Sequence, residues 1–417
     1  MFKLLQYKNS IINNTKVIKN YFFMTSLQLI SSLFGILIYP FLIRNLGAES
    51  YGLYVFALSV TTYYSTFITF GFSFPAVKAI VQNKDNLQIK NDVISNVFTA
   101  KIYLLIISSF VFGVLLFYIP IMKNNWLIFA ISFTQIIGDI LFPTWYFQGV
   151  QKMHVVTYIQ LTFRILSVPF IFLFVRLPAD CWIFVLISSL SSILGGITCV
   201  IFLLKNEKIK YRFVPLTSLK NYFKDAMPFF WSSSAGTIKE QSVTIIIGTF
   251  FNMKDVALYD LANKIIILPR MLTMSINSAL FPKIIENIQK NIIKEIIRIE
   301  TYIGFGVILG VILFGHWAIL ILGGVTMLDS YILAVILSIT VLVWLVVGCY
   351  INFIFVPEKK YYFVTRNQFV AFGTFFIFCI PGMYLFNNII VVVLSLILSG
   401  LSEIVYCNYL IKKYKLL

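Results

Sequence analysis

The sequence predicts an all-α integral membrane protein with twelve transmembrane helices in two six-helix lobes and both termini in the cytoplasm. Three observations predict this fold class. First, 59% of the 417 residues are hydrophobic and 12% are charged, whereas soluble domains are about 25% charged. Second, twelve apolar segments approach the roughly 20 residues that a helix needs to cross the hydrocarbon core. Third, the basic residues gather in alternate loops, as they do in multi-pass membrane proteins.

Each predicted helix is an apolar run, and the charged residues lie mostly in the loops between these runs. The first run is too long for a secretory signal peptide and lacks a small-residue cleavage site, so it is predicted to remain as the first span. The six spans of the first half are predicted at 21–43, 50–73, 95–119, 126–148, 155–175 and 181–204. The six spans of the second half are predicted at 226–250, 256–281, 301–322, 331–356, 367–386 and 389–411.

The net charge of +17 is concentrated on one side of this arrangement. Twenty-four lysines and arginines fall in loops on the side of the N-terminus, against four in the opposite loops, Arg44, Lys123, Arg176 and Lys254. Because basic loops remain in the cytoplasm, both termini are predicted to lie there. We expect the basic loops to meet membrane lipids with anionic headgroups, and we expect no nucleic acid partner.

The long polar loop 205–225 divides the chain into two halves that share a faint repeat. The second span begins LYVFA at Leu53 and the eighth begins LYDLA at Leu258, and both end in Phe-Pro. Six helices per half insert both halves from the same side, as parallel repeats of the kind that transporters use. The predicted domains are a basic N-terminus (1–20), an N-lobe (21–204), a cytoplasmic linker (205–225), a C-lobe (226–411) and a cytoplasmic tail (412–417).

Nine charged residues remain inside the predicted spans, where each costs on the order of 2.5–3.5 kcal/mol at a helix centre. Such charges are expected to face the interior of the helix bundle or a wet cavity. The segment SAGTIKEQSVTIII, from Ser234 to Ile247, places a cation and an anion side by side in an apolar stretch. The cations are Lys101, Arg164, Lys239, Lys264 and Arg270. The anions are Asp139, Glu240, Asp260 and Glu403.

Helical spacing places several of these charges on polar stripes. The stripe of the seventh span consists of Ser233, Thr237, Glu240 and Thr244, at intervals of four, three and four residues. The fourth, fifth and eighth spans carry similar stripes, so four helices are predicted to form the walls of a water-filled cavity. An excess of cations there indicates an anionic substrate, because Arg and Lys attract phosphate strongly in a low dielectric. Asp139 and Glu240 are candidate proton or sodium sites.

The same charges also admit simpler structural roles. Lys101 lies near the predicted cytoplasmic end of its helix, where a lysine can snorkel to the interface. Asp260 has a partner four residues along the helix in Lys264, and Glu403 has hydrogen-bonding residues within the last two helices. Lys239 either reaches the substrate or pairs with a neighbouring helix, and the sequence does not decide which.

Other residue types narrow the chemistry. Trp145, Tyr146 and Trp231 either belong to an interfacial aromatic belt or stack on sugar rings. The two histidines and five scattered cysteines lack metal-ligand or redox spacing, so no metal site and no cofactor are expected. The absence of a nucleotide-binding loop excludes ATP-driven transport by this chain alone. The short loops on the non-cytoplasmic side argue against a membrane glycosyltransferase or polymerase, so the prediction is a transporter and not an enzyme.

Four stretches of the sequence resemble Wzx-type polysaccharide flippases. YPFLIRNLGAESYGLYVFALSV (Tyr39–Val60) is similar to the first hairpin of that family, and FGFSFPAVKAI (Phe70–Ile80) is similar to the end of its second helix. PTWYFQGVQKM (Pro143–Met153) is similar to its Trp-aromatic-aromatic-Gln-Gly turn. LYDLANKI and ALFPKI, which begin at Leu258 and Ala279, resemble the matching elements of the second half. Each motif alone is weak, but the set is specific in its order and spacing.

The resemblance implies the fold of the multidrug/oligosaccharidyl-lipid/polysaccharide exporter superfamily, in which two lobes form a V around a central cavity, as in MATE exporters. It implies a flippase that moves an undecaprenyl-pyrophosphate-linked oligosaccharide, an O-antigen repeat unit, across the bacterial inner membrane by ion-coupled alternating access. It also implies an O-antigen polymerase and a chain-length regulator as partners. The residues predicted to hold the pyrophosphate are Arg164, Lys239, Lys264, Arg270 and Lys101. The candidates for ion coupling are Asp139, Glu240, Asp260 and Glu403.

Two alternatives share this fold: a MATE-like drug or metabolite exporter, and a flippase for capsule or other lipid-linked glycans. The drug exporters lack the feature seen here at Trp145–Gly149. Lipid II flippases typically carry two further helices, which this sequence does not show. The basic loop motif of the major facilitators is missing from Ala76–Asp92. The identity of the glycan and the choice between H⁺ and Na⁺ stay open.

Overall fold

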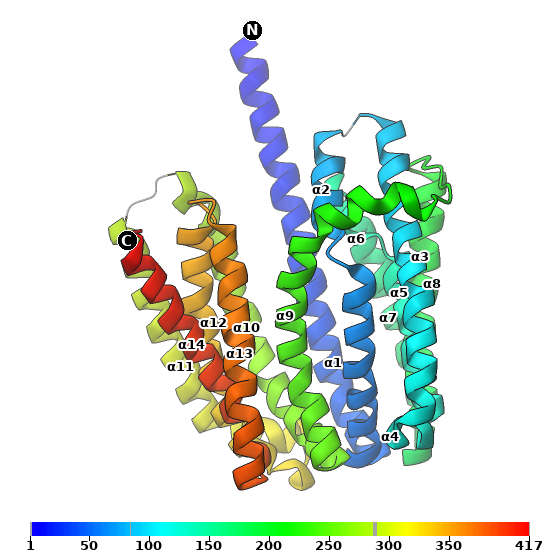
Figure 1. The fold of residues 1–417 in the computed structure, drawn as a ribbon, viewed down its shortest axis with the longest axis vertical. Coiled ribbons are helices and arrows are strands. Elements are labelled where there is room, and N and C mark those ends of the chain that lie inside the picture. The colour runs from blue at the N-terminus through cyan, green and yellow to red at the C-terminus, as the bar shows by residue number, and fades with distance from the viewer. Residues whose placement is uncertain (1, 84, 287–289, 417) are drawn as a thin grey trace. The chain divides into compact units, whose positions relative to one another are not determined.

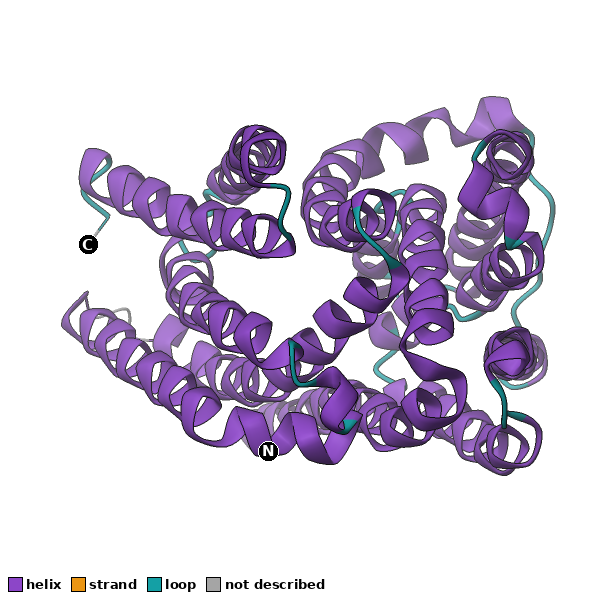
Figure 2. Cartoon of the chain, turned by 90° about the horizontal axis from the view of Figure 1, so that it is seen from below, coloured by secondary structure: helices purple, strands orange, loops and turns teal. Residues whose placement is uncertain are grey.

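The computed structural model describes residues 2–83, 85–286 and 290–416, with the side chains of 2–21, 272–286, 290 and 292 left undescribed. Over these residues the chain consists of helices joined by short loops, without a β-strand (Figure 2). The prediction of an all-α protein is therefore confirmed for the described part of the chain. The helices are labelled in chain order in Figure 1.

Fourteen α-helices are present among the described residues, several of them much longer than those of soluble domains. Those of the first half are α1 (Phe2–Thr69), α2 (Ser73–Gln82), α3 (Leu87–Tyr118), α4 (Pro120–Asn124), α5 (Trp126–Leu141), α6 (Thr144–Gly149), α7 (Met153–Phe174) and α8 (Cys181–Lys205). Those of the second half are α9 (Lys220–Phe250), α10 (Met253–Glu286), α11 (Lys290–Gly323), α12 (Ser330–Tyr350), α13 (Tyr361–Phe386) and α14 (Ile389–Lys413). Short 3₁₀ turns precede α8, α9 and α12, and a π-helical turn, η4 (Ile351–Phe355), follows α12.

Nine helical stretches of the described chain are long and apolar enough to cross a membrane. Eight of them overlap one predicted span each, although those at Leu87, Ile293 and Tyr361 begin six to eight residues before the predicted start. The ninth, Phe22–Thr69, covers the first two predicted spans together. Gly47 lies between those two spans and has non-helical backbone angles of φ 75° and ψ 166°, so two helical segments meet there within α1. A positive φ of this size favours glycine, because a Cβ would be strained. The stretches are Phe22–Thr69, Leu87–Tyr118, Trp126–Gly149, Met153–Phe174, Pro178–Lys205, Ile293–Gly323, Ser330–Phe355, Tyr361–Phe386 and Ile389–Lys413.

The predicted seventh and eighth spans coincide with α9 and α10, helices of 31 and 34 residues. Neither is among the nine stretches, because α9 carries Lys239 and Glu240 within its apolar part, and α10 is described with side chains only as far as Met271. The polar residues that make α9 a poor membrane span by composition are the residues that build the candidate site below.

The chain forms two compact units. The first consists of Met1–Ser31 and Thr61–Ser233, and the second of Ser32–Val60 and Ser234–Leu417. The middle of α1 therefore packs with the C-terminal helices, while its ends belong with the N-terminal ones. The domain boundaries predicted from the sequence, with lobes at 21–204 and 226–411, stay a prediction.

The first unit is built around α5, α7 and α8. Small residues let α5 and α8 approach closely: a Cβ on Gly138 would collide with Ser192, and one on Gly196 would collide with Leu141. Aromatic rings fill the space beside this contact, where Phe112 stacks on Phe133 with centroids 4.3 Å apart. Close helix packing at small residues is the usual way in which membrane helices associate.

The polar linker of the first unit runs against the start of α3. The backbone N–H of Lys210 donates to Oδ1 of Asn91 (2.9 Å), and that of Arg212 donates to Oγ of Ser95 (3.0 Å). The Arg212 guanidinium also pairs with Asp92 at 2.7 Å. The part of the predicted cytoplasmic linker around Lys210 and Arg212 is thus held along the first turns of this helix.

The second unit has its core between α12, α13 and α14. Buried side chains from all three helices and from the π-helical turn η4 meet there, among them Val346, Phe353, Phe363, Cys407 and Leu410. Burial of large apolar side chains on all sides is expected for a helix in the middle of a bundle. Accordingly, α12 is the most deeply buried of the nine membrane-crossing stretches.

Gly52 of α1 marks the closest approach of α1 to the start of α10, because a Cβ there would collide with the backbone carbonyl of Met253. We expect Gly52→Ala to destabilise the protein by about 1–3 kcal/mol, since overpacking outweighs the ~1 kcal/mol that alanine contributes to a helix. Gly35→Ala on the same helix is the matched control, because nothing lies within 4 Å of its added Cβ. Thermal unfolding in detergent compares them, and equal melting temperatures would contradict this packing.

Candidate functional site

The site begins with two adjacent charges on α9, Lys239 and Glu240. Neighbouring residues of a helix point about 100° apart, so the two side chains meet different partners. Lys239 reaches α14, where its Nζ lies 2.7 Å from Oε1 of Glu403. Glu240 reaches α10, where its Oε1 lies 3.3 Å from the guanidinium of Arg270. Lys239 thus pairs with a neighbouring helix in this structure, one of the two alternatives that the sequence left open, and its contact with a substrate stays a prediction.

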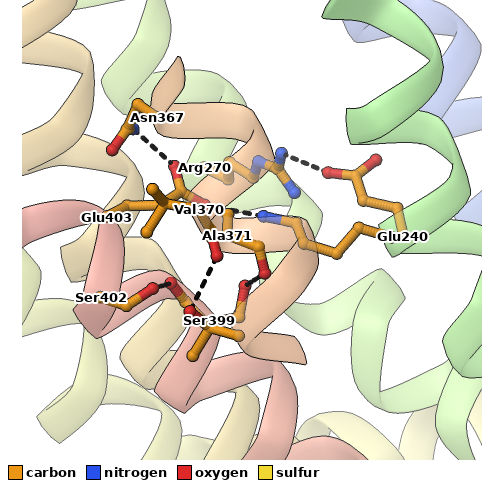
Figure 3. A network of polar contacts seen from close by, with 10 residues as sticks. Glu240, Arg270, Asn367, Val370, Ala371, Ser399, Ser402 and Glu403 are labelled. Carbon is orange, nitrogen blue, oxygen red and sulfur yellow. Dashed lines mark hydrogen bonds and ion pairs between the residues drawn. The ribbon is translucent and has the colours of Figure 1, made fainter. Parts of the chain in front are cut away.

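The Lys239–Glu403 ion pair is buried. The two side chains are 12% and 9% exposed. The second carboxylate oxygen of Glu403 accepts a hydrogen bond from Nδ2 of Asn367 on α13 at 3.2 Å. Oδ1 of Asn367 is buried without a hydrogen-bond partner. Three helices of the second unit thus contribute to one polar contact (Figure 3).

Hydroxyl groups hold α13 and α14 in place around this pair. Ser399 of α14 donates to the carbonyl of Ala371 on α13 at 2.8 Å, a bond between the two helices. Ser402 and Thr374 donate to carbonyls of their own helices, at 2.6 Å to Ser399 and 2.8 Å to Val370. Glu403 of α14 therefore lies one turn from a hydroxyl group that bonds α14 to α13 (Figure 3).

Arg270 is held in a different way. Its guanidinium lies 3.1 Å from the centroid of the Trp344 ring of α12, a cation–π contact. Its partner Glu240 is half exposed, at 50%, so that ion pair alone contributes little. Arg270 is also attracted electrostatically by the carboxylate of Glu403. Lys239, Glu240, Arg270 and Glu403 therefore form one charge network, with two cations and two anions.

A second group of polar residues joins α1 to α10. The ammonium of Lys264 pairs with Asp260 one helical turn away, and the hydroxyl of Tyr51 donates to Oδ2 of Asp260 at 2.8 Å. The same ammonium lies 5.5 Å and 5.7 Å from the ring centroids of Tyr39 and Tyr51. The hydroxyl of Tyr39 is buried without a hydrogen-bond partner. We refer to Tyr39, Tyr51, Asp260 and Lys264 as the tyrosine–lysine cluster.

The sequence pattern identified Asp260 and Lys264 but missed the two tyrosines. Tyr39 and Tyr51 both lie in the stretch that resembles the first hairpin of the flippases. A spacing of twelve residues that includes the break at Gly47 has no helical periodicity to detect. Their position within the resembling stretch is the signal that could have identified them.

The remaining predicted charges lie in the first unit. Lys101 of α3 is buried and is attracted by Asp139 of α5, which accepts a hydrogen bond from Oγ of Ser65 at 3.0 Å. Arg164 of α7 is partly buried, and its guanidinium donates to the carbonyl of Ser31 at 3.3 Å. The predicted charges therefore fall into three groups: the charge network, the tyrosine–lysine cluster and these first-unit residues.

The three predicted aromatic residues have unlike surroundings. Trp145 and Tyr146 of α6 are buried, and the Tyr146 hydroxyl donates to Glu207 at 3.1 Å. Lys152 pairs with the same carboxylate at 2.6 Å. Trp231 of α9 is 53% exposed. In the Trp-Tyr-Phe-Gln-Gly turn, the tyrosine therefore anchors the start of the linker, and stacking on a sugar stays a prediction for all three rings.

The charge network is suited to exchanging anionic partners. Each of its cations is held by a carboxylate, and a phosphate oxygen makes the same charge-assisted hydrogen bonds with lysine and arginine. In the described part of the chain, no three His, Cys, Asp or Glu residues gather as a metal site would require. The chemistry that these residues support is electrostatic binding of an anion in a low-dielectric environment.

Comparisons with known sequences place the chain among polysaccharide-related membrane proteins. Residues 17–288 match the family model described as "Polysaccharide biosynthesis protein". The chain is 24% identical over 288 residues to the "Putative O-antigen transporter" of Escherichia coli (strain K12), which covers 69% of each protein. It is 26% identical over 257 residues to a protein of the same description from Shigella dysenteriae, covering 60% of this chain and 63% of the relative.

Solved structures with the same arrangement of helices are transport proteins. One is described as "Lipid II flippase MurJ, inward closed conformation", with a TM-score of 0.68 and 13% identity over 93% of this chain and 87% of the other. Another is the inward-facing conformation of a multidrug resistance MATE family transporter of the MOP superfamily, with a TM-score of 0.63 and 12% identity over 93% and 95% of the two chains. At these identities the likeness shows a shared fold.

Proposed function

This chain belongs to the polysaccharide biosynthesis protein family, and we propose that it is a flippase for a lipid-linked oligosaccharide. The resemblance seen in its four sequence stretches is confirmed by this family match and by the O-antigen transporter relatives. It is a multi-pass membrane protein with a transporter fold. It acts by moving a molecule, and no bond in that molecule is made or broken.

The charge network is the observation that carries this proposal. A lipid-linked oligosaccharide has a diphosphate between its lipid and its sugars, and this diphosphate must cross a medium in which charge is costly. Lys239 and Arg270 are cations within helices of the second unit, and each is held by a carboxylate that a phosphate can replace. In the proposed cycle, the diphosphate takes the place of Glu403 and Glu240 as their partner.

The substrate we propose is an undecaprenyl-pyrophosphate-linked O-antigen unit. Lys264, Arg164 and Lys101 are further candidates for contacting its phosphates or acidic sugars, and Trp231 is the exposed candidate for a sugar ring. The lipid tail stays in the bilayer. An O-antigen polymerase and a chain-length regulator are the proposed partners that act on the product.

We further propose twelve transmembrane helices, with α9 and α10 as the seventh and eighth, and both termini in the cytoplasm. The distribution of lysine and arginine among the loops supports this orientation. The proposed membrane is the bacterial inner membrane, where lipid-linked glycans are assembled on the cytoplasmic face.

The predicted ion-coupling carboxylates are better suited to the role of counterion. Glu403, Asp260 and Glu240 are each paired with a cation, and Asp139 is attracted by Lys101. A carboxylate that already has a lysine or arginine gains little from binding a further cation. In the proposed cycle, these groups hold the cations in place until the substrate arrives.

A multidrug or metabolite exporter is the second candidate, because the fold is shared with MATE transporters. Deletion of the gene in its host separates the two proposals. For the flippase we expect long-chain surface polysaccharide to disappear from a gel of cell-envelope extracts and to return when the chain is expressed from a plasmid. Normal polysaccharide together with new drug sensitivity would favour the exporter.

A further inference from the structure

Among the residues whose side chains the structure describes, one buried carboxyl group of the second unit lies without a cationic partner. Glu300 of α11 is 3% exposed. Its Oε2 accepts a hydrogen bond from the thiol of Cys349 on α12 at 2.8 Å. Its Oε1 is also buried and has no hydrogen-bond partner. A thiol is a weak donor, so this environment does not compensate a full negative charge.

The other polar groups nearby are engaged elsewhere or face away. On α11 itself, Lys294 and Arg298 are exposed. On α12, the hydroxyl of Tyr350 donates to Oδ1 of Asn408 of α14 at 3.0 Å. Cys407 of α14 is a buried thiol in the same apolar core. Helix α10 also packs against α11, but its side chains beyond Met271 lie outside the described residues.

Tight packing of α11 against α12 keeps water from Glu300. One turn further along α11, a Cβ on Gly304 would press against the backbone and side chain of Leu342, so the two helices are in close contact there. Ile296 and Ile297 of α11 pack against the apolar core on the other side. The carboxyl group is therefore buried beside a close helix contact, and its described hydrogen-bond partner is a thiol.

We propose that Glu300 and Cys349 form a proton-binding site, and that the ion coupled to transport is a proton carried there. The neutral acid places its proton on Oε1, while Oε2 accepts from the thiol. An ionised carboxylate would lack a countercharge among the described side chains, whereas the neutral acid leaves only a hydroxyl unpaired. Sodium, as a hard cation, needs several oxygen ligands, and a single carboxyl beside a thiol does not provide them.

The backbone of α12 offers a way for the site to open. The π-helical turn η4 begins at Ile351, two residues after Cys349, and the N–H of Val356 after it donates to the carbonyl of Ile351, five residues back. Such turns occur frequently at functional sites. Movement of α12 at this turn would admit water to Glu300 and release the proton. This coupling rests on the proposed transport function, whereas the proton site itself does not.

Infrared spectroscopy of the purified protein in lipid tests the site directly. We expect a carbonyl stretch of a protonated carboxyl group at neutral pH that is absent from Glu300→Gln and retained in Glu295→Gln. Glu295 lies on the same helix and is exposed, so it is the matched control. Cys349→Ala should retain the band at a higher frequency, because Oε2 no longer accepts a hydrogen bond. A spectrum unchanged by Glu300→Gln and Cys349→Ala would overturn the proposal.

Complementation of the deletion strain tests the coupling. Glu300→Gln should lower surface polysaccharide on the order of tenfold or more, as for a coupling free energy of usual size, while Glu295→Gln should leave it unchanged. Full polysaccharide with Glu300→Gln would overturn the coupling. If the unaltered chain does not restore polysaccharide, the transport function fails, and the infrared result still decides whether Glu300 binds a proton.

Discussion

Replacing Lys239 by methionine is expected to destabilise the protein by about 3–5 kcal/mol and to abolish transport, because it leaves Glu403 as an unpaired buried charge. The side chains of this pair are 12% and 9% exposed, so solvent does not screen the remaining carboxylate. Thermal unfolding of the purified protein measures the first effect, and surface polysaccharide in a complemented deletion strain measures the second.

A second variant separates stability from transport. In Lys239→Met with Glu403→Gln both charges are removed, so most of the lost stability should return, since a neutral pair leaves no charge uncompensated. Transport should remain absent, because α9 no longer supplies a cation for the diphosphate. Restored polysaccharide in the double variant would contradict the proposed role of Lys239.

The ion pair between Arg212 and Asp92 provides the control for this experiment. The distance between its nitrogen and oxygen atoms is 2.7 Å, the same as in the Lys239–Glu403 pair, but its side chains are 73% and 38% exposed. Exposed pairs contribute at most about 1 kcal/mol. Arg212→Met should therefore change the melting temperature little. If Arg212→Met lowered the melting temperature as much as Lys239→Met, burial would not be what distinguishes the two ion pairs.

The nine helical stretches that are long and apolar enough to cross a membrane all overlap predicted spans, because their signal is local. A run of about 20 apolar residues identifies a span without knowledge of its neighbours. That Lys239 and Glu240 point in different directions also follows from the sequence, since their angular difference on a helix is a property of α9 alone. The partners of these residues lie 164 and 30 positions away, and no local pattern specifies them.

Glu300 shows where counting charges within spans fails. The ninth span was predicted to begin at residue 301, so this glutamate was assigned to a loop, where a charge needs no explanation. Helix α11 begins at Lys290 and carries Glu300 into the buried part of the unit. The mixed charges of residues 290–300 hide the apolar face of the helix, because hydropathy averages over all faces. A helical periodicity of apolar residues at Ile293, Ile296 and Ile297 was the available signal.

Four carboxyl groups of the second unit divide by their described partners into two proposed roles. Glu403, Glu240 and Asp260 are each paired with a cation, and in the proposed cycle they hold that cation until a competing anion replaces them. Glu300 has no cation among its described partners, so the proposed role for it is to bind a proton. Substrate binding and proton binding are thus assigned to different groups on neighbouring helices, α12 being common to both through Trp344 and Cys349.

Arg270→Glu is expected to abolish surface polysaccharide while the protein remains in the membrane. The reversal places an anion beside Glu240 and under the field of Glu403, where it repels a diphosphate. Loss of even one charge-assisted hydrogen bond, worth roughly 1.5–3 kcal/mol, corresponds to about tenfold or more in binding. Arg164→Glu makes the same reversal in the first unit. Immunoblots of membranes measure the amount of protein, and gels of cell-envelope extracts measure surface polysaccharide. Normal polysaccharide in both variants would exclude these cations from the substrate path.

Two further variants assign the effect to the guanidinium itself. Arg270→Lys keeps the charge but loses the planar contact with Trp344, 3.1 Å from the ring centroid, so polysaccharide should fall to an intermediate level. Glu240→Gln removes the half-exposed partner and should change transport little, because Trp344 still holds the guanidinium in place. If Glu240→Gln were as defective as Arg270→Glu, the carboxylate and not the cation would be the essential group, and the diphosphate would need another binding site.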